Sequence, residues 1–362
     1  MRLYDLSAMM KSAMRLLVML ICLLTAWGDG KASQTTTLAF GSCLRQWKPQ
    51  PVWSAVLAER PDAFVFLGDN VYTDKGPLRH ADEPGRIEQA YARLAEDAGF
   101  ASLRASIPIY ATWDDHDYGR NDGGREYPWK HRSKRVFLDF FSVPEAAEER
   151  SRSGIYTVRY LDQGDRRIQI ILLDTRFFRS PLKVAPTANG CPRRKLLPNK
   201  GPDATLLGEA QWAWLEKTLR TPADLRIIVS SIQVIPDEHC FEKWANFPTE
   251  RERLFQLIRD SAADGVVILS GDRHLGEISR LPADIVGYPL FEVTASGLNS
   301  AGAGRGEQNR YRITDDNVRE DHFGVLQIDW LQPEPSLHIS LKGVDGQELG
   351  ALNVPLDMLR RP

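Results

Sequence analysis

Short apolar runs alternate with helix-like stretches along most of the chain. Residues 63–67 (Ala-Phe-Val-Phe-Leu) form an unbroken apolar run typical of a buried strand, and residues 52–60 before them have the apolar spacing of a helix. The same pattern predicts further strands at 37–40, 107–113, 168–173, 225–230 and 266–269. This alternation predicts β-α-β units and therefore an α/β fold.

Further helices are expected between these strands. The spacing of apolar residues predicts helices at 87–98, 134–141 and 207–219. The sequence Thr-Glu-Arg-Glu at 249–252 has the form of a capping box, so we expect another helix to begin there, with Gly265 as its stop.

The pattern changes near the C-terminus. Three segments there alternate apolar and polar positions and are joined by Pro or Gly turns, which predicts antiparallel strands at 322–330, 336–341 and 348–354. Long stretches rich in Gly, Pro and Asp are predicted to be loops that rim a pocket, at 74–86, 181–206 and 297–320. We expect residues 34–362 to form a single domain.

The N-terminal segment differs from the rest. Lys11 and Arg15 precede an apolar run at 16–27 that is too short to cross a membrane comfortably. Residues 1–33 are therefore predicted to be a signal peptide, and the protein to be secreted or periplasmic. The alternative is an uncleaved membrane anchor.

Composition and charge narrow the possible partners. The formal net charge is −2 and there is no polybasic run, which argues against nucleic acid or a membrane as a stable partner. Cys191 and Cys240 lie in loop-like surroundings, where they form either a disulfide or two separate thiols. No Gly-x-Ser-x-Gly elbow or Walker A sequence occurs, so neither a serine hydrolase nor a P-loop protein is indicated.

Three acidic motifs follow predicted strands directly. They are Gly68-Asp-Asn-Val-Tyr72, Trp113-Asp-Asp-His-Asp-Tyr-Gly119 with Asn121-Asp122 after it, and Ser270-Gly-Asp-Arg-His274. Open α/β sheets bind ligands at the carboxyl ends of their strands. A carboxylate there can bridge two cations, and Asp69 is placed to do so. Each motif taken alone also has a structural interpretation. Asp69 would then cap a turn, residues 113–119 would form a solvated acidic loop, and His274 would be a structural residue.

A fourth motif, Gly41-Ser-Cys43-Leu-Arg45, follows the first predicted strand. A thiolate from Cys43 would be a soft ligand for iron or zinc, although a lone free cysteine is more often buried and inert. In this order, Gly-Ser-Cys, Gly-Asp-Asn-Val-Tyr, Trp-Asp-Asp-His-Asp-Tyr-Gly and Ser-Gly-Asp-Arg-His resemble the motifs of the alkaline phosphatase D family of metallophosphoesterases. The resemblance covers roughly residues 36–300.

The resemblance implies a four-layer α/β/β/α sandwich of two mixed sheets flanked by helices. It implies that one metal is bound by Cys43, Asp69, Tyr72 and His274, and a second by Asp69, Asp115 and Asp272. The metals would be Fe³⁺ with Ca²⁺, with Zn²⁺ or Mn²⁺ as alternatives.

The expected reaction is hydrolysis of a phosphate ester by a metal-activated water, with His116 contacting the phosphate. Four further residues are candidates for substrate binding: Asn70, Arg120, Asn121 and Arg176. Arg45, Arg120 or Arg176 could supply a guanidinium that clamps the phosphate. The alternative is that each of them is a surface charge. A phosphomonoesterase, a phosphodiesterase of phospholipase type and a non-catalytic metal- or phosphate-binding protein all remain open.

Overall fold

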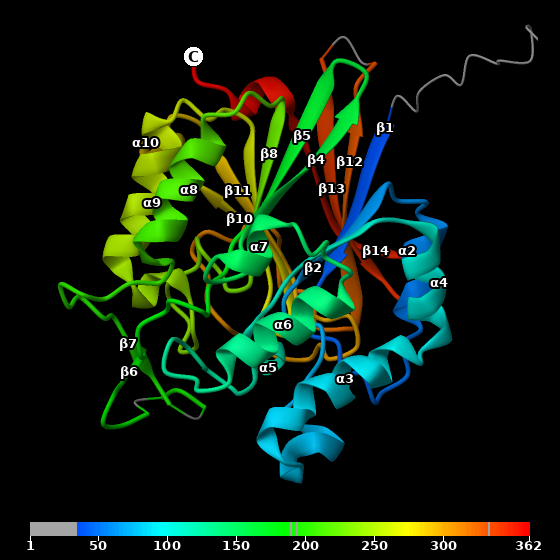
Figure 1. Cartoon of the computed structure of the whole chain (residues 1–362). Coiled ribbons are helices and arrows are strands. Elements are labelled where there is room, and N and C mark those ends of the chain that lie inside the picture. The colour runs from blue at the N-terminus through cyan, green and yellow to red at the C-terminus, as the bar shows by residue number, and fades with distance from the viewer. Residues whose placement is uncertain (1–34, 189, 193, 332–333) are drawn as a thin grey trace, which may run out of the picture. The chain divides into compact units, whose positions relative to one another are not determined.

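Two six-stranded mixed β-sheets face each other in the computed structural model, which describes residues 35–188, 190–192, 194–331 and 334–362 (Figure 1). Residues Thr35–Pro362 form one compact unit. The predicted signal peptide at 1–33, with its alternative of a membrane anchor, lies outside the described residues. Within the described ranges, no helix has the length and apolar character needed to cross a bilayer.

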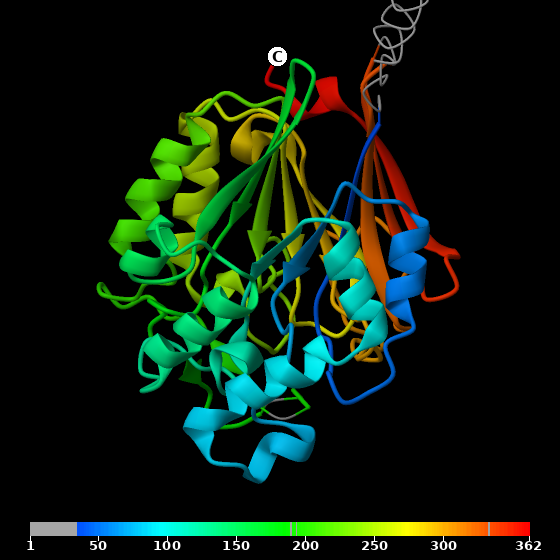
Figure 2. The same cartoon turned by 45° about the vertical axis from the view of Figure 1, so that its right-hand side comes forward.

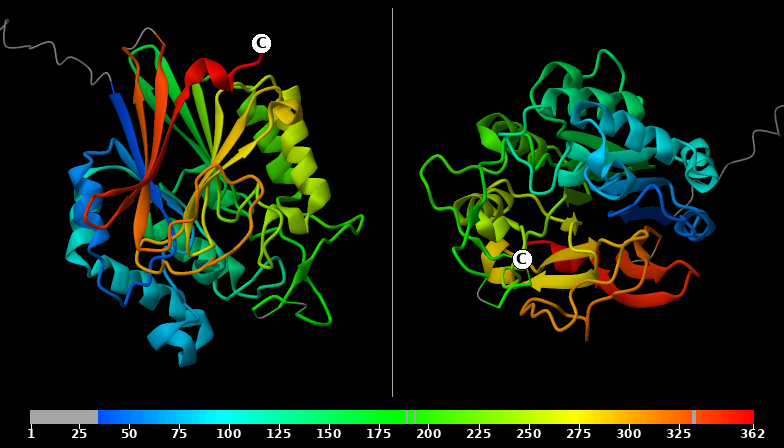
Figure 3. Two further views of the ribbon diagram at one scale, coloured as in Figure 1. Left: turned by 180° about the vertical axis from the view of Figure 1, so that it is seen from behind. Right: turned by 90° about the horizontal axis from the view of Figure 1, so that it is seen from below.

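The first sheet joins the N-terminal strands to the C-terminal ones. Its order is β14 (Glu348–Pro355), β13 (Ser336–Gly343), β12 (His322–Asp329), β1 (Thr35–Gly41), β2 (Ala63–Leu67) and β3 (Ile109–Thr112). The strands β1, β2 and β3 run parallel, whereas β12, β13 and β14 pair antiparallel, as their alternating pattern predicted. Figure 3 shows the C-terminal strands of this sheet from behind.

The second sheet has a parallel centre with an antiparallel strand at each edge. Its order is β10 (Gly276–Leu281), β11 (Leu290–Ala295), β9 (Val266–Ser270), β8 (Leu225–Ser230), β5 (Arg166–Leu172) and β4 (Thr157–Gln163). The strands β5, β8, β9 and β11 are parallel. A small separate ribbon pairs β6 (Lys183–Val184) with β7 (Leu196–Leu197).

Helices cover the outer face of each sheet, which gives the four layers. The first sheet is covered by α2 (Val52–Ala58), α3 (Arg86–Ala95), α4 (Ala98–Ser106) and α6 (Lys130–Phe140). The second is covered by α8 (Gly208–Leu219), α9 (Pro248–Asp260) and the short α10 (Ala283–Val286). Shorter elements are α5 (Asp115–Tyr118), α7 (Glu148–Ser151) and the 3₁₀ turns Gly76–His80, Glu83–Gly85, Trp244–Asn246 and Leu356–Leu359. The predicted α/β/β/α sandwich is confirmed.

The unbroken apolar sequence of β2 reflects burial on both of its faces. Phe64 and Phe66 pack in the cluster with the outer helices, whereas Val65 and Leu67 pack in the cluster shared with the second sheet. Successive side chains of a strand point to opposite faces, so a strand between two layers needs apolar residues at every position.

The predicted capping box at 249–252 is wrong. The helix α9 begins at Pro248, with Phe247 as its N-cap and no side-chain cap. Thr249 therefore lies inside the first turn and cannot be the N-cap that a box with Glu252 would need. The Glu250 carboxylate in the same turn accepts hydrogen bonds from the backbone N–H groups of Leu206 and Leu207 and from the Trp212 indole.

The parallel strands of both sheets end on the same side of the molecule, as their arrowheads show in Figure 2. Hydrogen bonds join the two sheets there. The Ser42 N–H donates to the Ala295 carbonyl at 3.0 Å, and the Thr112 hydroxyl donates to the Leu173 carbonyl at 2.6 Å. The polar residues that follow strands of both sheets are therefore brought to one place.

Candidate metal centre

Four of the predicted metal ligands have left-handed backbone conformations. The φ angles are 62° at Cys43, 50° at Asp69, 68° at Asp272 and 54° at His274. Residues other than glycine rarely adopt this region, and such conformations gather at functional sites, where the surrounding structure enforces them. Each of these residues follows a strand in a sharp turn.

Two glycines allow the strand ends to come close together. A Cβ atom on Gly68 would lie 2.6 Å from the Asp114 Cβ, and one on Gly271 would lie 2.5 Å from the Ser42 Oγ. Gly68 also has a φ of 104°. A side chain at either position would push the loops apart, so glycine is required for this close approach.

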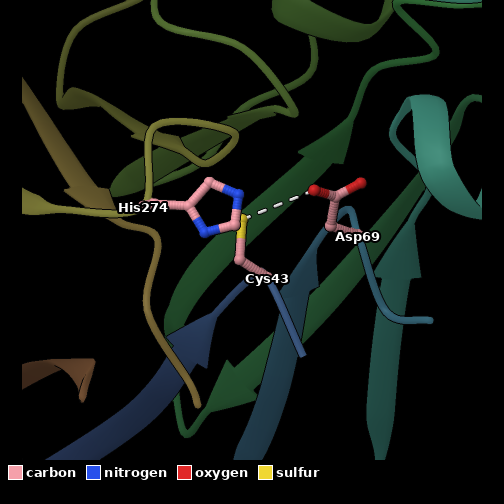
Figure 4. A group of neighbouring side chains, drawn as sticks. All are labelled: Cys43, Asp69 and His274. Carbon is pink, nitrogen blue, oxygen red and sulfur yellow. Dashed lines mark hydrogen bonds between the residues drawn. The ribbon is translucent and has the colours of Figure 1, made fainter. Parts of the chain in front are cut away.

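The first ligand group consists of Cys43, Asp69 and His274, whose ligand atoms all lie within 4.8 Å of one another (Figure 4). The buried Cys43 thiol donates to the Asp69 Oδ2 at 3.5 Å and lies 3.0 Å from the Ser296 hydroxyl. Sulfur, carboxylate and imidazole together suit iron or zinc.

Hydrogen bonds fix the orientation and tautomer of the His274 ring. Its Nδ1 lies 2.5 Å from the Ser300 carbonyl, which can only accept, so Nδ1 carries the proton. The unprotonated Nε2 lies 3.3 Å from the Tyr72 hydroxyl. Burial lowers the pKa of His274 to about 4, which keeps the imidazole neutral. A neutral ring with a carbonyl partner on its far nitrogen is the usual form of a histidine ligand.

The second group consists of Asp69, Asp115 and His116. It shares Asp69 with the first group, and the Asp69 Oδ1 accepts the His116 backbone N–H at 3.3 Å. The His116 Nδ1 lies 2.5 Å from the Asp74 Oδ1. Burial alone would lower the pKa of His116, but the carboxylates of Asp115, Asp69 and Asp74 raise it to about 9. The carboxylates therefore favour the protonated form of the ring, in which both nitrogens donate and neither can bind a metal.

A third group joins Asp115 to Asp122 and Glu242. It is made only of carboxylates, a donor set that suits a hard cation such as Ca²⁺. Asp115 Oδ1 is buried without a hydrogen-bond partner among the described residues.

The acids of the site oppose one another's ionisation. Burial raises the pKa of Asp69 to about 6, and burial together with the Asp115 carboxylate raises that of Asp272 to about 8. Burial and the Asp69 carboxylate raise the pKa of the Cys43 thiol. Bound cations would relieve this repulsion, so the donor set fits a centre of two or more metals.

The remaining acids of the 113–119 motif have structural partners. Asp117 accepts the backbone N–H groups of Asp114 at 2.6 Å and Asn70 at 3.2 Å. Asp114 is fully buried and pairs with the guanidinium of Arg176, which also contacts Glu242 at 2.6 Å. Only Asp115 and His116 of this string belong to the ligand groups.

The four candidate substrate-binding residues lie in different surroundings. Asn121 lines the cavity over the ligand groups, whereas Arg120 is outside its lining and pairs with Glu126 at 3.5 Å. Asn70 is buried, with its Nδ2 donating to the Thr112 carbonyl and its Oδ1 lacking a partner in the described part of the chain. Arg176 is fully buried with both edges of its guanidinium paired, which leaves no edge open to a ligand.

A cavity of about 510 Å³ opens over the ligand groups. Tyr72, Asp115, His116, Asp272 and His274 all line it. One wall includes Cys240, which forms a disulfide with Cys191, so of the two alternatives for this pair the disulfide is the one present. The segment 297–320 supplies another part of the rim and is orange in Figure 3.

Removing this disulfide is expected to lower stability. The bond joins residues 49 positions apart, and a loop of this size limits the unfolded chain by up to about 4 kcal/mol. The double variant Cys191→Ser, Cys240→Ser should therefore melt roughly 5 °C lower in a thermal scan. Reduction of the wild-type protein should give the same shift, and an unchanged melting temperature in both would contradict the prediction.

Sequence reasoning missed several partners of the ligands, namely Asp74, Glu242, Ser296 and Ser300. The Ser296 hydroxyl contacts two of the predicted ligands, since it lies 3.0 Å from the Cys43 thiol and accepts the His274 backbone N–H at 2.7 Å. Ser296 directly follows β11, a strand in which Glu292 and Thr294 stand among apolar residues. The end of this strand was the available signal for Ser296, whereas nothing local marks Glu242.

Known proteins resemble this chain in sequence and in fold. Residues 38–331 match the family model described as PhoD-like phosphatase. Alkaline phosphatase D of Bacillus subtilis (strain 168) is 24% identical over 322 residues, which cover 79% of this chain and 54% of that protein. The chain thus spans about half the length of that relative.

Solved structures show the likeness of fold. A structure of PhoD superposes with a TM-score of 0.66 at 20% identity, covering 89% of this chain and 68% of the other. The purple acid phosphatase PPD1 from yellow lupin (Lupinus luteus) seeds gives a TM-score of 0.55 at 13% identity, covering 89% and 54%.

Proposed function

Because this chain belongs to the PhoD-like phosphatase family, we propose that it is a metal-dependent phosphoesterase that hydrolyses phosphate mono- or diesters with water. The observation that carries the proposal is the sharing of Asp69 between two ligand groups, since a carboxylate between two cations is the centre of a two-metal site.

In this proposal one metal is held by Cys43, Asp69, Tyr72 and His274. The Tyr72 hydroxyl supports its inclusion, because it lies 3.3 Å from the His274 Nε2. The other metal is held by Asp69, Asp115 and Asp272, of which the last two line the cavity. No third cation is assigned to Asp115, Asp122 and Glu242, because Asp122 and Glu242 pair with Arg194 and Arg176.

When bound, the cations would lower the pKa of a water molecule and neutralise charge on the phosphoryl group. The protein supplies the rest of the chemistry. His116 lines the cavity with its Nδ1 against the Asp74 carboxylate, so its protonated ring can donate to a phosphoryl oxygen or to the leaving group. The Asn121 N–H donates to the same Asp74 at 2.8 Å, which holds that carboxylate in place.

The donor types favour Fe³⁺ with Ca²⁺. Thiolate, phenolate and imidazole suit a transition metal, whereas an all-carboxylate group suits calcium. Zn²⁺ and Mn²⁺ are the alternatives. We also propose that residues 1–33 direct the protein to a secreted or periplasmic location, which the Cys191–Cys240 disulfide supports.

The proposal is tested by hydrolysis of chromogenic phosphate mono- and diesters by the purified protein. Activity is measured after chelation and after adding back iron with calcium, zinc or manganese. We expect hydrolysis that chelation removes and metals restore. Metal binding without hydrolysis of any ester would overturn the proposal in favour of a binding protein.

Replacing Cys43 by serine is expected to change the metal that is bound. A serine hydroxyl is a harder and weaker donor than a thiolate, so iron should be bound less well and Ca²⁺ or Mn²⁺ affected less. Elemental analysis and the visible absorption of the iron-loaded protein measure this. Tyr72→Phe is the companion variant, and unchanged spectra and metal content in both would contradict the assignment of these ligands.

A further inference from the structure

Of the three arginines considered for a guanidinium clamp, Arg45 is the one that lines the cavity. Arg176 is buried and paired, and Arg120 lies outside the lining. Arg45 follows the Gly-Ser-Cys motif closely, and its guanidinium lies 5.7 Å from the centre of the Tyr72 ring. It is therefore positioned beside the proposed metal centre.

The backbone of Arg45 is held in place without help from its side chain. Its N–H donates to the Asn299 Oδ1 at 2.7 Å, and the Asn299 Nδ2 donates to its carbonyl at 3.0 Å. The Nε of Arg45 is buried and has no hydrogen-bond partner among the described residues. The Arg45 backbone is thus fixed by Asn299, and the guanidinium Nε can still donate a hydrogen bond to a ligand.

Lys75 supplies a second cation to the same cavity. It immediately follows Asp74, which contacts His116, so it is carried on the segment that orients that ring. Trp47 links this segment to that of Arg45, because its ring packs against Tyr72 at 6.2 Å and leaves no room for a side chain at Gly76. Arg45 and Lys75 are therefore presented by two adjoining loops.

The other cations of the lining are already compensated. Arg194 pairs with Asp122, and Arg273 pairs with Glu307 at 2.6 Å. Within the described ranges, neither Arg45 nor Lys75 has a carboxylate in salt-bridge distance. In the proposed function, bound metals neutralise the carboxylates of Asp115 and Asp272 in the cavity. The positive charges of Arg45 and Lys75 therefore remain available to an anionic ligand.

We propose that Arg45 and Lys75 bind a second anionic group of the substrate, so that the preferred substrates are phosphate esters that carry another phosphate or a similar anion. This inference rests on the proposed function, in which the metals and His116 hold the phosphate that reacts. Arginine and lysine side chains in a partly enclosed site form strong charge-assisted hydrogen bonds to such groups.

The test compares propyl phosphate with 1,3-propanediol bisphosphate, each also offered as its p-nitrophenyl diester, on the metal-loaded protein. The two esters have the same three-carbon chain and differ only in whether its far end carries a phosphate. We expect kcat/KM to be at least about tenfold higher for the ester that carries the second phosphate. Arg45→Ala and Lys75→Ala should each reduce this preference severalfold, mainly through KM, and Arg45→Lys should restore part of it.

Arg79→Ala is the matched control, since Arg79 is an exposed arginine on the same 74–86 loop outside the cavity lining. It should leave the preference unchanged. An equal loss on both esters in Arg45→Ala would overturn the inference, because the guanidinium would then act on the reacting phosphate. Hydrolysis without any preference would also overturn it, whereas no hydrolysis of any ester would overturn the proposed function itself.

Discussion

Replacing Asp69 by asparagine is expected to lower kcat/KM for phosphate esters by about 10³-fold or more. Asp69 belongs to both neighbouring ligand groups, so removing its charge weakens two metals at once. Metal content should fall together with activity. Steady-state kinetics and elemental analysis of the purified variant, at saturating added metal, measure both effects.

Asparagine is chosen because of the backbone at this position. Asp69 has a φ of 50°, a conformation that asparagine adopts readily and alanine does not. The variant therefore tests the carboxylate charge with little added strain, and its melting temperature in chelator should stay near that of the wild type. Asp82→Asn, at an exposed position of the 74–86 loop, is the control and should keep full activity. Full turnover by Asp69→Asn would refute the site assignment.

The largest expected loss of stability comes from Arg176→Met. Methionine fills most of the space of the arginine, but Asp114 would then lose its buried cationic partner and keep only the Ser231 hydroxyl among the described side chains. Removing one partner of a buried ion pair costs about 3–5 kcal/mol. The melting temperature should fall by roughly 4–7 °C in a thermal scan of the metal-free protein.

Arg93→Ala provides the comparison for an exposed ion pair. Arg93 contacts Glu96 at 2.6 Å, but its side chain is 59% exposed and that of Glu96 is 63% exposed. Such pairs contribute about 0–1 kcal/mol, so its melting temperature should change by no more than about 1 °C. Equal shifts in the two variants would show that the buried network around Arg176 does not stabilise the fold as proposed.

The structure also distinguishes residues that the sequence presents as equivalent. Asp114, Asp115 and Asp117 occur within four positions of one motif, yet only Asp115 lines the cavity. Asp114 is directed to Arg176, and Asp117 to backbone N–H groups. The Arg176 partner of Asp114 lies 62 residues away in the chain, and the Asn70 partner of Asp117 lies 47 residues away. No local sequence pattern contains such distant partners.

The Glu250 carboxylate illustrates the same limit for helix ends. The Thr-Glu-Arg-Glu string satisfies a capping pattern with Thr249 as N-cap, but the helix begins earlier, at Pro248. In its first turn, Glu250 accepts N–H groups of Leu206 and Leu207 from a distant loop. Those buried N–H groups would be costly to leave unpaired, and no local pattern shows this requirement.

The sequence by itself determined the fold class, most strand positions and the four motifs that follow strands. It could do so because a strand buried on both faces needs a continuous apolar run, and the end of that run is visible locally. Tertiary structure alone decided which acids share a cavity, which arginine is free to meet a ligand, and where the backbone is left-handed. Those features depend on how two sheets meet, through contacts such as Ser42 with Ala295, between residues 253 positions apart in the chain.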